Sequence, residues 1–424
     1  MTATTPTRHT SLEALRPTLP GVQPGIAGAA SVADRQPAPT PIATLSTLET
    51  PCLVLDETRM TRNIARLRTR LDTLGVGLRP HLKTGKSIEV ARRMMASPHG
   101  PATVSTLKEA AQFAASGVRD IVYAVGITPD KLARVLALRA EGVDLIVLLD
   151  TVEQAEAVAR ASREAGTPIP ALIEIDCDGH RSGVLPTQTD ALLAIGQALQ
   201  QGAELRGVLT HAGGSYSARG TEALQRCAQQ ERDAVVAAAT LLRDAGLPCP
   251  VVSLGSTPTA HHATDLDGVT QIRAGVFVFF DLVMAGIGIC AIDDIAISVL
   301  GTVIGHQHDK GWIIVDAGWM SMSRDRGTAR QAVDQGYGIV CDLDGQPYPD
   351  LILADANQEH GIITVRPGSD GVLPSLAIGD RVRILPNHAC ATASQHAGYH
   401  VVQGTVVHGA DQGVTAYWPR FGGW

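Results

Sequence analysis

The stretch from Leu78 to Ser87, "LRPHLKTGKS", joins the end of an apolar strand to the start of a helix, and its lysine, Lys83, stands at the junction. A single lysine at such a place is most often an ordinary exposed charge. Its surroundings decide whether it has a function, because barrel enzymes carry their catalytic side chains on the loops that follow the strands.

Short apolar or β-branched runs alternate with amphipathic segments that end at glycine from Thr50 onward, a pattern typical of strands followed by helices. After an entry strand and a helix from Glu57 to Leu74, eight strands follow at helix-separated spacing: "LRPHLK", "ATVST", "DIVYAV", "VDLIVLLD", "ALIEIDCD", "LRGVLTHAG", "VVSLGS" and "VTQIRAGVF". Eight is the strand number of a (β/α)8 barrel, so the sequence predicts an α/β fold of this kind.

The pattern changes on both sides of the predicted barrel. Residues 1–45 are rich in Ala, Pro, Thr and Gly, and we expect them to form a flexible leader. The C-terminal part contains β-rich runs separated by turn residues, among them "DIAISVLGTVIGHQ", "GWIIVDAG", "RVRILPNHA" and "HVVQGTVVH". The sequence therefore predicts a barrel over residues 46–283 and a mostly antiparallel β domain over residues 284–424.

Composition excludes several classes of protein. Of the 424 residues 45% are hydrophobic and 18% charged, which is typical of a well-packed globular enzyme. The net charge of −7 and the lack of a basic tract argue against binding to nucleic acid or to an anionic membrane. No apolar run is long enough to span a bilayer.

Cysteine usage indicates a reducing compartment. The seven cysteines are odd in number, scattered and never spaced as C-x-x-C, which argues against a disulfide framework and a zinc ribbon. Because an apolar secretory signal is also lacking, we expect the cytoplasm. The cysteines are Cys52, Cys177, Cys227, Cys249, Cys290, Cys341 and Cys390.

Polar and basic side chains follow four of the predicted barrel strands. They are His81 and Lys83 after the first, Arg181 after the fifth, His211 and Tyr216 after the sixth, and Gly255, Ser256 and Thr257 after the seventh. A Gly-Ser-Thr turn offers backbone N–H groups and two hydroxyls to a phosphate. A strand-end lysine that faces a phosphate-binding turn is what a Schiff-base cofactor requires, so Lys83 is predicted to hold pyridoxal phosphate.

Each of these residues also has a plainer explanation. "GSTPT" can be an ordinary turn, and Arg181 can pair with a nearby acid such as Asp176 or Asp178. His211 and Tyr216 can simply line the end of a strand. The cofactor hypothesis rests on their combination in one barrel mouth.

Several longer motifs strengthen the hypothesis: "RPHLKTGKS", "IEIDCDGHRSGV", "THAGGSY", "VSLGSTPT", "IRAGVFVFFD", "VDAGWMSMSRDRGTA", "NQEHG" and "PNHAC". Together they resemble the fold-type III pyridoxal-phosphate enzymes with an alanine-racemase-like barrel, and among these the group of D-serine dehydratase and D-threonine aldolase. The likeness runs from about residue 48 to the C-terminus. It implies a homodimer in which the β domain of one subunit covers the barrel mouth of the other.

The resemblance implies roles for individual residues. Lys83 would be the Schiff-base lysine, and Gly255, Ser256 and Thr257 the phosphate loop, with His211 among the cofactor-binding residues. Tyr216 would face the pyridine nitrogen, where racemases of this fold use arginine. Arg181 would lie near the phenolic oxygen of the ring, and His388 and Cys390 would bind a metal.

The metal pair also has a rationale of its own. In an extended segment residues i and i+2 point to the same face, so His388 and Cys390 can bind one ion. A thiolate with an imidazole favours zinc over magnesium or manganese. Nearby, "NQEHG" contains Glu359 and His360, and His360 is either a proton-handling residue at the barrel mouth or part of an exposed turn.

The motif "SRDRG" holds Arg324, Asp325 and Arg326, which we interpret as a structural, ion-paired loop at a domain or subunit boundary.

The implied reaction is β-elimination from a D-3-hydroxy amino acid of the D-threo-3-hydroxyaspartate or D-serine type. Lys83 would remove the α-proton, and a metal on His388 and Cys390 would assist the departure of the β-hydroxyl. The products would be a 2-oxo acid and ammonia. A neutral Tyr216 fits this reaction, because it leaves the pyridine nitrogen less strongly protonated than a cation would.

Three rival hypotheses remain. A D-threonine-type aldolase would release glycine and an aldehyde, but family resemblance places Asp in the aldolases where this chain has Cys390. A racemase needs a second base on the opposite face, for which the sequence offers no placed tyrosine. A non-catalytic pyridoxal-phosphate carrier would lack the second domain. The partner expected in every catalytic case is a small amino acid.

Overall fold

Eight parallel strands form one sheet of the computed structural model, which describes residues 41–404 and 411–424. Their order is β3-β10-β9-β8-β7-β6-β5-β4. The bounds are β3 (Gly77–Leu78), β4 (Ala102–Val104), β5 (Asp120–Gly126), β6 (Asp144–Leu149), β7 (Pro170–Ile175), β8 (Glu204–Thr210), β9 (Val251–Leu254) and β10 (Gln271–Ile272). The predicted eight-stranded α/β barrel is confirmed, while the predicted leader lies mostly outside the described residues.

The two ends of this strand order are joined by the segment that carries Lys83. His81 forms a parallel bridge with Thr103 in β4, and the N–H of Leu82 donates to the carbonyl of Thr103 at 2.8 Å. On its other side, the N–H of His81 donates to the carbonyl of Ala274 at 2.8 Å, just after β10. The stretch that opens the predicted barrel therefore also closes the ring.

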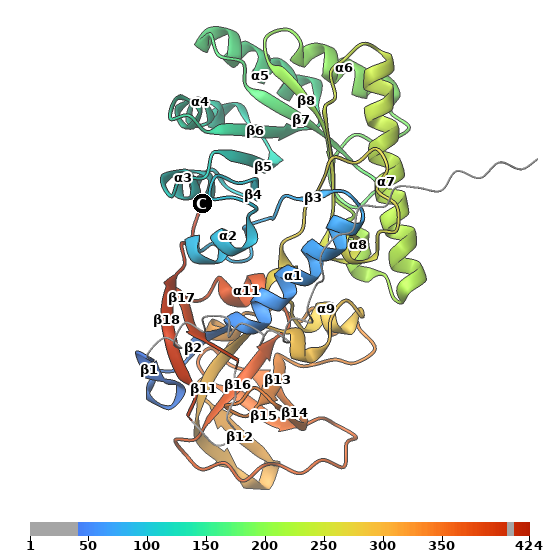
Figure 1. The fold of residues 1–424 in the computed structure, drawn as a ribbon. Coiled ribbons are helices and arrows are strands. Elements are labelled where there is room, and N and C mark those ends of the chain that lie inside the picture. The colour runs from blue at the N-terminus through green and yellow to red at the C-terminus, as the bar shows by residue number, and fades with distance from the viewer. Residues whose placement is uncertain (1–40, 405–410) are drawn as a thin grey trace, which may run out of the picture. The chain divides into compact units, whose positions relative to one another are not determined.

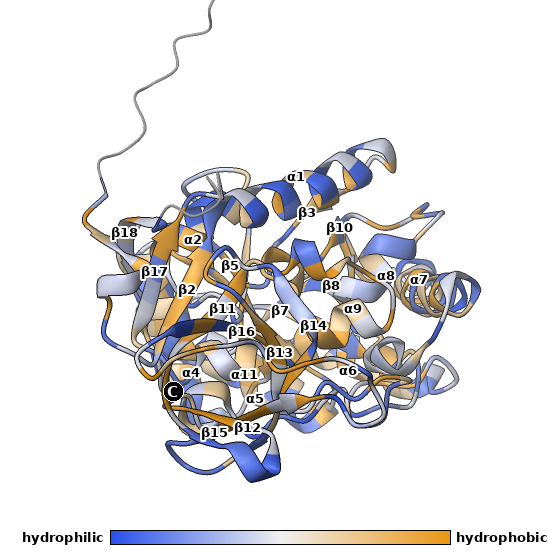
Figure 2. Cartoon of the chain, turned by 90° about the horizontal axis from the view of Figure 1, so that it is seen from below, coloured by the Kyte–Doolittle hydropathy of each residue, from blue (hydrophilic) through white to orange (hydrophobic). Residues whose placement is uncertain are grey.

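Helices lie on the outside of the barrel sheet, with α1 before its first strand and α2 to α8 after the strands (Figure 1). Their bounds are α1 (Glu57–Thr73), α2 (Ile88–Met94), α3 (Leu107–Ala115), α4 (Leu132–Ala140), α5 (Val152–Ala165), α6 (Thr189–Leu199), α7 (Thr221–Asp244) and α8 (Thr257–His262). Helix α1 buries Met60, Ile64, Leu67 and Leu71, a helical spacing that gives one apolar face. Figure 2 shows β2 and β7 as mainly hydrophobic, whereas α1 alternates between hydrophobic and hydrophilic residues.

A ten-stranded sheet forms the rest of the described chain, in the order β1-β18-β17-β2-β11-β12-β15-β14-β13-β16, and β11 also pairs with β16. The bounds are β1 (Ala43–Thr44), β2 (Cys52–Asp56), β11 (Ile297–Gln307), β12 (Trp312–Val315), β13 (Gly338–Cys341), β14 (Pro347–Ala356), β15 (Gly361–Val365), β16 (Arg381–Pro386), β17 (Gly398–Val402) and β18 (Gly413–Pro419). Its pairings are antiparallel except between β17 and β2. The predicted antiparallel β domain is confirmed, although residues 405–410 of the run "HVVQGTVVH" lie outside the described ranges.

Strand β2 belongs to this second sheet and not to the barrel. It pairs with β11 through Val54 and Ser298 and with β17 through Val54 and His400. Figure 1 shows it in blue among the orange and red strands. Residues 52–56, which the predicted boundaries assign to the barrel, therefore contribute to the other sheet, while the boundary at residue 283 remains a prediction.

Three short helices, α9 (Leu282–Gly286), α10 (Trp319–Met322) and α11 (Ala389–Ala393), lie in the part of the chain after the barrel strands. Over the described ranges, we find no helix with the length and apolar character that a bilayer crossing requires.

Candidate active site

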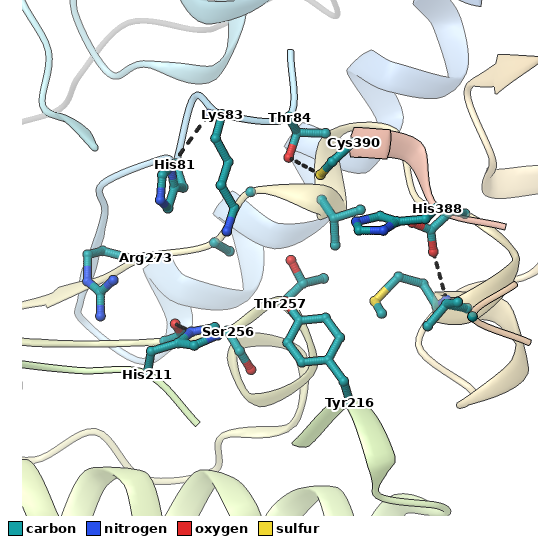
Figure 3. Close-up of a pocket in the computed structure, with 18 of the residues that line it drawn as sticks. His81, Lys83, Thr84, His211, Tyr216, Ser256, Thr257, Arg273, His388 and Cys390 are labelled. Carbon is teal, nitrogen blue, oxygen red and sulfur yellow. Dashed lines mark hydrogen bonds between the residues drawn. The ribbon is translucent and has the colours of Figure 1, made fainter. Parts of the chain in front are cut away.

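A cavity of about 670 Å³ lies at the carboxyl ends of the barrel strands. The predicted residues that line it are Lys83, Arg181, His211, Tyr216, Gly255, Ser256, Thr257, His388 and Cys390. Figure 3 shows most of them around one space, with Lys83 and Cys390 on one side and Tyr216 opposite. The structure therefore brings together nine of the ten predicted site residues.

Lys83 follows β3 and has an exposed side chain that points into the cavity (Figure 3). Within the described ranges it makes no ion pair with an acid. Beside it, burial lowers the pKa of His81 well below its usual range, and the charge of Lys83 lowers it further. His81 is therefore neutral, so Lys83 is the cation on this wall.

The loops after β9 and β10 present backbone N–H groups to the same cavity. Among the described residues, the N–H groups of Gly275 and Val276 have no hydrogen-bond acceptor, and that of Thr257 is directed at the Tyr216 hydroxyl; all these residues line the cavity. N–H groups that converge on one space form a binding site for an anion. Ser256 caps α8, because its Oγ accepts from the N–H of Thr259 at 3.2 Å.

Gly255 is required by the first of these loops. Its φ is +136°, and a Cβ placed there would lie 2.2 Å from the carbonyl oxygen of Arg273. Any larger residue would push β9 away from the segment after β10 and would also be strained in its backbone. The glycine thus keeps the N–H groups of the two loops close to the cavity.

His211 and Tyr216 line the wall next to this loop. His211 Nδ1 lies 2.9 Å from the carbonyl of Gly255, and because a carbonyl only accepts, Nδ1 carries the hydrogen. Burial lowers the pKa of His211 to about 3 against the effect of that hydrogen bond, so the ring is neutral. Burial also raises the pKa of Tyr216 well above its usual value, so it keeps its proton.

Arg181 lies at the cavity with its side chain about half exposed, and its Nη2 is 3.5 Å from Glu174. Arg181 thus contacts Glu174 and neither Asp176 nor Asp178. Asp176 instead accepts backbone N–H groups of its own loop, including that of Gly179 at 2.8 Å. The predicted pairing of Arg181 with an acid is found, but with a residue at the end of β7.

Arg273 is a cavity residue that was not predicted from the sequence. Its side chain is only 4% exposed, its Nε donates to Ser253 Oγ at 3.0 Å, and its Nη2 donates to the carbonyl of Thr210. Burial lowers its pKa to about 10, which leaves it charged at neutral pH. An arginine in the otherwise apolar run "QIRAGVF" was the available signal, since a charged residue is seldom buried in a strand without a role.

His388 and Cys390 both face the cavity (Figure 3), but not for the predicted reason. The segment is not extended through both positions, because β16 ends at Pro386, His388 is the N-cap of α11, and Cys390 lies in the first turn of that helix. Cys390 Sγ lies 3.2 Å from Thr84 Oγ1, and both His388 and Cys390 line the cavity. A helix start, rather than a strand, therefore brings them together.

Asp325 pairs with His388 and Arg326 pairs with Asp334, so the ion pairs expected for "SRDRG" are found, and Asp325 also lines the cavity. Its Oδ2 lies 2.6 Å from His388 Nδ1. Burial acts to lower the pKa of His388, but the hydrogen bonds to Asp325 and Cys390 outweigh it and raise the pKa to about 11. Burial raises the pKa of Cys390, but His388 and then Lys83 bring it below its usual value.

Two buried residues hold the loop of Asp325 and the start of α11 in place. Asn387 donates to the carbonyls of Gly336 at 2.7 Å and Asp325 at 3.2 Å, so it ties the loop of Asp325 to α11. Asp281 accepts from the N–H of Ala389 at 2.9 Å, which anchors the start of α11 to the end of the barrel. Within the described ranges, no cluster of three or more His, Cys, Asp or Glu side chains has the arrangement of a metal site.

His360 is not part of this cavity. It lies in the exposed turn between β14 and β15, and its carbonyl accepts from the N–H of Asn357 at 2.7 Å. Glu359 is exposed in the same turn. His360 therefore lies in an exposed turn and does not line the cavity of its own chain, while its catalytic role remains a prediction.

Glu231 holds the loops after β8 and β9 in place. It is fully buried on α7, and its Oε1 accepts the N–H groups of Ala212 at 2.8 Å and Gly255 at 3.1 Å. Burial raises its pKa from 4.5 to about 7, against the lowering effect of these hydrogen bonds. The folded protein therefore binds more protons than the unfolded chain between these two pH values.

Replacing Glu231 by Gln should flatten the pH dependence of stability. Because the folded pKa is raised, the contribution of Glu231 is present at low pH and is lost as the pH rises toward about 7. From about pH 5 to about pH 8 the free energy of unfolding should fall by ~2 kcal/mol less in Glu231→Gln than in the wild type. Urea unfolding of both proteins at several pH values across this range measures the difference. The same pH dependence in the two proteins would contradict the raised pKa of Glu231.

Comparison with known proteins defines the class. A family model for the alanine racemase N-terminal domain matches residues 55–283, and one for a putative serine dehydratase domain matches residues 296–402. The chain belongs to the alanine-racemase-like family of fold-type III pyridoxal-phosphate enzymes, in the group that carries a dehydratase-type C-terminal domain.

Within that class, the chain is 55% identical over 384 residues to D-threo-3-hydroxyaspartate dehydratase of Delftia sp. strain HT23, which covers 90% of this chain and 99% of that protein. The solved structure of that dehydratase superposes with a TM-score of 0.86. A solved variant of a D-threo-3-hydroxyaspartate dehydratase, with a cysteine replaced by alanine, is described as metal-free and is 54% identical, with a TM-score of 0.85 over 90% of this chain and 100% of that chain.

More distant relatives include a D-serine dehydratase of Dictyostelium discoideum, 28% identical over 84% of this chain and 94% of that protein. A D-threonine aldolase of Arthrobacter sp. is 29% identical over 86% of this chain and 91% of that protein. The similarity to the hydroxyaspartate dehydratase is thus much higher than the similarity to an aldolase.

Proposed function

We propose that this chain is a dehydratase of D-3-hydroxy amino acids, dependent on pyridoxal phosphate and a divalent metal, that releases a 2-oxo acid and ammonia. The observation that carries the proposal is the meeting of Lys83, the unpaired N–H groups of Gly275 and Val276, and the pair His388 and Cys390 on one cavity. D-threo-3-hydroxyaspartate is the first candidate substrate, because a relative that is 55% identical is named for it.

The residues of the cavity fit the cofactor. Lys83 supplies an amine, and the N–H groups of Thr257, Gly275 and Val276 would receive the phosphate. Gly255 lets the two loops approach, since a Cβ there would lie 2.2 Å from a carbonyl oxygen. The chemistry that pyridoxal phosphate supplies when bound is an acceptor for the electron pair left by α-proton removal.

Cationic and neutral groups set the polarity of the cavity. Lys83, with no acid partner in the described ranges, would take the α-proton of the substrate. His211 and Tyr216 stay neutral over the working pH range, because burial moves their pKa values away from neutrality. Arg273 is the buried cation, and its charge favours anions bound beside it.

His388 and Cys390 would hold the metal. Asp325 occupies Nδ1 of His388, which leaves Nε2 for the ion. A thiolate with an imidazole favours zinc over magnesium or manganese, and the chemistry supplied would be that of a Lewis acid for a leaving hydroxyl. In two solved variants of D-threo-3-hydroxyaspartate dehydratase the replaced histidine and cysteine are two positions apart, like His388 and Cys390, and the cysteine variant is metal-free.

Product analysis tests the proposal against its rivals. The purified protein would be incubated with D-serine, D-threonine and D-threo-3-hydroxyaspartate, with and without a chelator, and ammonia, glycine and enantiomers would be measured. We expect chelator-sensitive ammonia and 2-oxo acid. Glycine with an aldehyde would establish the aldolase, the L-enantiomer a racemase, and no turnover a carrier.

We also propose a homodimer in the cytoplasm. A barrel mouth open to solvent needs a cover that excludes water during the reaction, and the predicted cover is the β domain of a second subunit. All seven cysteines are unpaired, which agrees with a reducing compartment. A fully active monomer in analytical ultracentrifugation would contradict the dimer.

A further inference from the structure

A second cavity, of about 840 Å³, adjoins the first. Six residues line both: Lys83, Ser105, Val125, Asp325, His388 and Cys390. A substrate of the proposed reaction must reach Lys83 and the pair His388 and Cys390 at once, so its reacting carbons must lie in the space that the cavities share. Groups attached to those carbons therefore extend toward one cavity or the other, and the cofactor fills the first.

The second cavity carries four basic side chains away from this shared space: Lys86, Lys131, Arg134 and Arg420. Lys86 is already paired, because its Nζ lies 3.0 Å from Glu109. Arg134 is exposed to solvent, where a charge binds an anion only weakly. Lys131 and Arg420 are partly buried and have no carboxylate partner in the described ranges.

Arg420 is held at a fixed place relative to Lys83. Its Nε donates to Tyr399 Oη at 3.2 Å, and that hydroxyl donates to the carbonyl of Gly85 at 2.7 Å. The side chain of Tyr399 is fully buried, so these contacts are shielded from water. Phe421, the next residue, donates to the carbonyl of Lys86 at 2.9 Å. Both Nη groups of Arg420 remain free for a planar acceptor in the described chain.

Lys131 comes from a different strand end. It closes a short helical turn, Pro129–Lys131, that follows β5. Its Nζ donates to Tyr123 Oη at 3.2 Å, and the side chain of Tyr123 is buried in β5. The ammonium group can form up to two further hydrogen bonds.

The acids of the second cavity do not neutralise these two cations. Glu109 is paired with Lys86, and Asp325 is bound to His388. Asp130, the third acid, is exposed on the short turn that contains Lys131. Two unpaired cations at a partly closed cavity create a site for an anion, and an arginine with both Nη groups free suits a carboxylate.

We propose that Arg420 and Lys131 bind a second carboxylate of the substrate, one attached to its β-carbon. This inference rests on the proposed function. It defines the substrate class as 3-hydroxy dicarboxylic amino acids, such as D-threo-3-hydroxyaspartate. D-Serine, which has a hydrogen at that position, leaves both cations without a partner.

Steady-state ammonia release from D-threo-3-hydroxyaspartate and D-serine tests the inference in the variants Arg420→Met and Lys131→Met. Each should lower kcat/KM for the dicarboxylate by about 10- to 100-fold, the range expected for a lost hydrogen bond to a charged group. The value for D-serine should stay within about threefold. Arg226→Met, an exposed arginine on α7 outside both cavities, is the matched control.

Parallel losses for both substrates would overturn the inference, because they would mean that the cations bind the α-carboxylate or only support the fold. Since Arg420 contacts Tyr399, thermal unfolding of Arg420→Met is measured alongside the rates. Lys131→Met tests the same carboxylate site while leaving the contact between Arg420 and Tyr399 in place.

Ligand binding, measured without turnover, tests this inference independently of the proposed reaction. Calorimetric titration of the holoenzyme with D-aspartate and D-alanine, which lack a 3-hydroxyl, measures the contribution of the second carboxylate without turnover. Tighter binding of D-aspartate that is lost in Lys131→Met supports the inference even if no ammonia is released. Absence of ammonia release would contradict only the proposed dehydratase reaction. Equal binding of the two ligands overturns the inference even if D-serine is dehydrated.

Discussion

Lys83→Ala should lower ammonia release at least about a thousandfold, because on the proposed mechanism Lys83 both attaches the cofactor and takes the α-proton. The wild-type protein should be yellow and absorb visible light, and the variant should lose the absorption of the attached cofactor. Spectra and initial rates measured on the same preparations check both parts.

The attachment point can be located directly. Borohydride reduction followed by peptide mass spectrometry should find the cofactor on Lys83. Lys310→Ala, a lysine that stacks on Trp312 in the β domain, serves as the control and should keep both colour and activity. Cofactor attached to any other lysine would refute the site.

Cys390→Ala should have the second large effect, a loss of ammonia release on the order of a hundredfold or more, as expected if a metal aids the leaving hydroxyl. The variant should still exchange the α-proton of the substrate with solvent, because Lys83 is untouched. Proton NMR in deuterium oxide follows the exchange, and a coupled assay follows the ammonia.

The same experiment separates a catalytic metal from a structural one. A structural ion would leave the chelated protein less stable, with exchange and ammonia release impaired together. Near wild-type ammonia release in Cys390→Ala would show that metal-assisted elimination is wrong for this chain. Cys390→Asp, with a harder ligand, should recover some metal binding with a preference for magnesium or manganese.

The sequence predicted the barrel well because its information is local. Strands buried on both faces, such as β6 and β7, read as continuous apolar runs, and helices that end at glycine separate them. The strand ends then locate Lys83, Tyr216 and Thr257 on one rim, since parallel strands point their carboxyl ends the same way. No contact between distant residues was needed for that step.

The missed features depend on distant contacts. Asp325 reaches His388 across 63 positions of the chain, and no spacing rule links them. Arg273 lies inside a strand-like run, where its side chain could not be assigned a direction from the sequence. The motif that contains His360 lies on the solvent side of a hairpin turn of its own chain, so only a second subunit could bring it to a cavity, and the sequence does not show that arrangement.

The position of β2 has a consequence for how the chain acquires its structure during synthesis. Its hydrogen-bonding partners, β11 and β17, begin at residues 297 and 398. One edge of β2 must therefore wait for β11, and the other edge stays unpaired until β17 has been made, when the chain is nearly complete. The barrel strands all precede β11 in the chain, so the barrel can form before the second sheet is complete. A ribosome stalled before β17 would expose an apolar strand edge, which makes incomplete chains natural clients of chaperones.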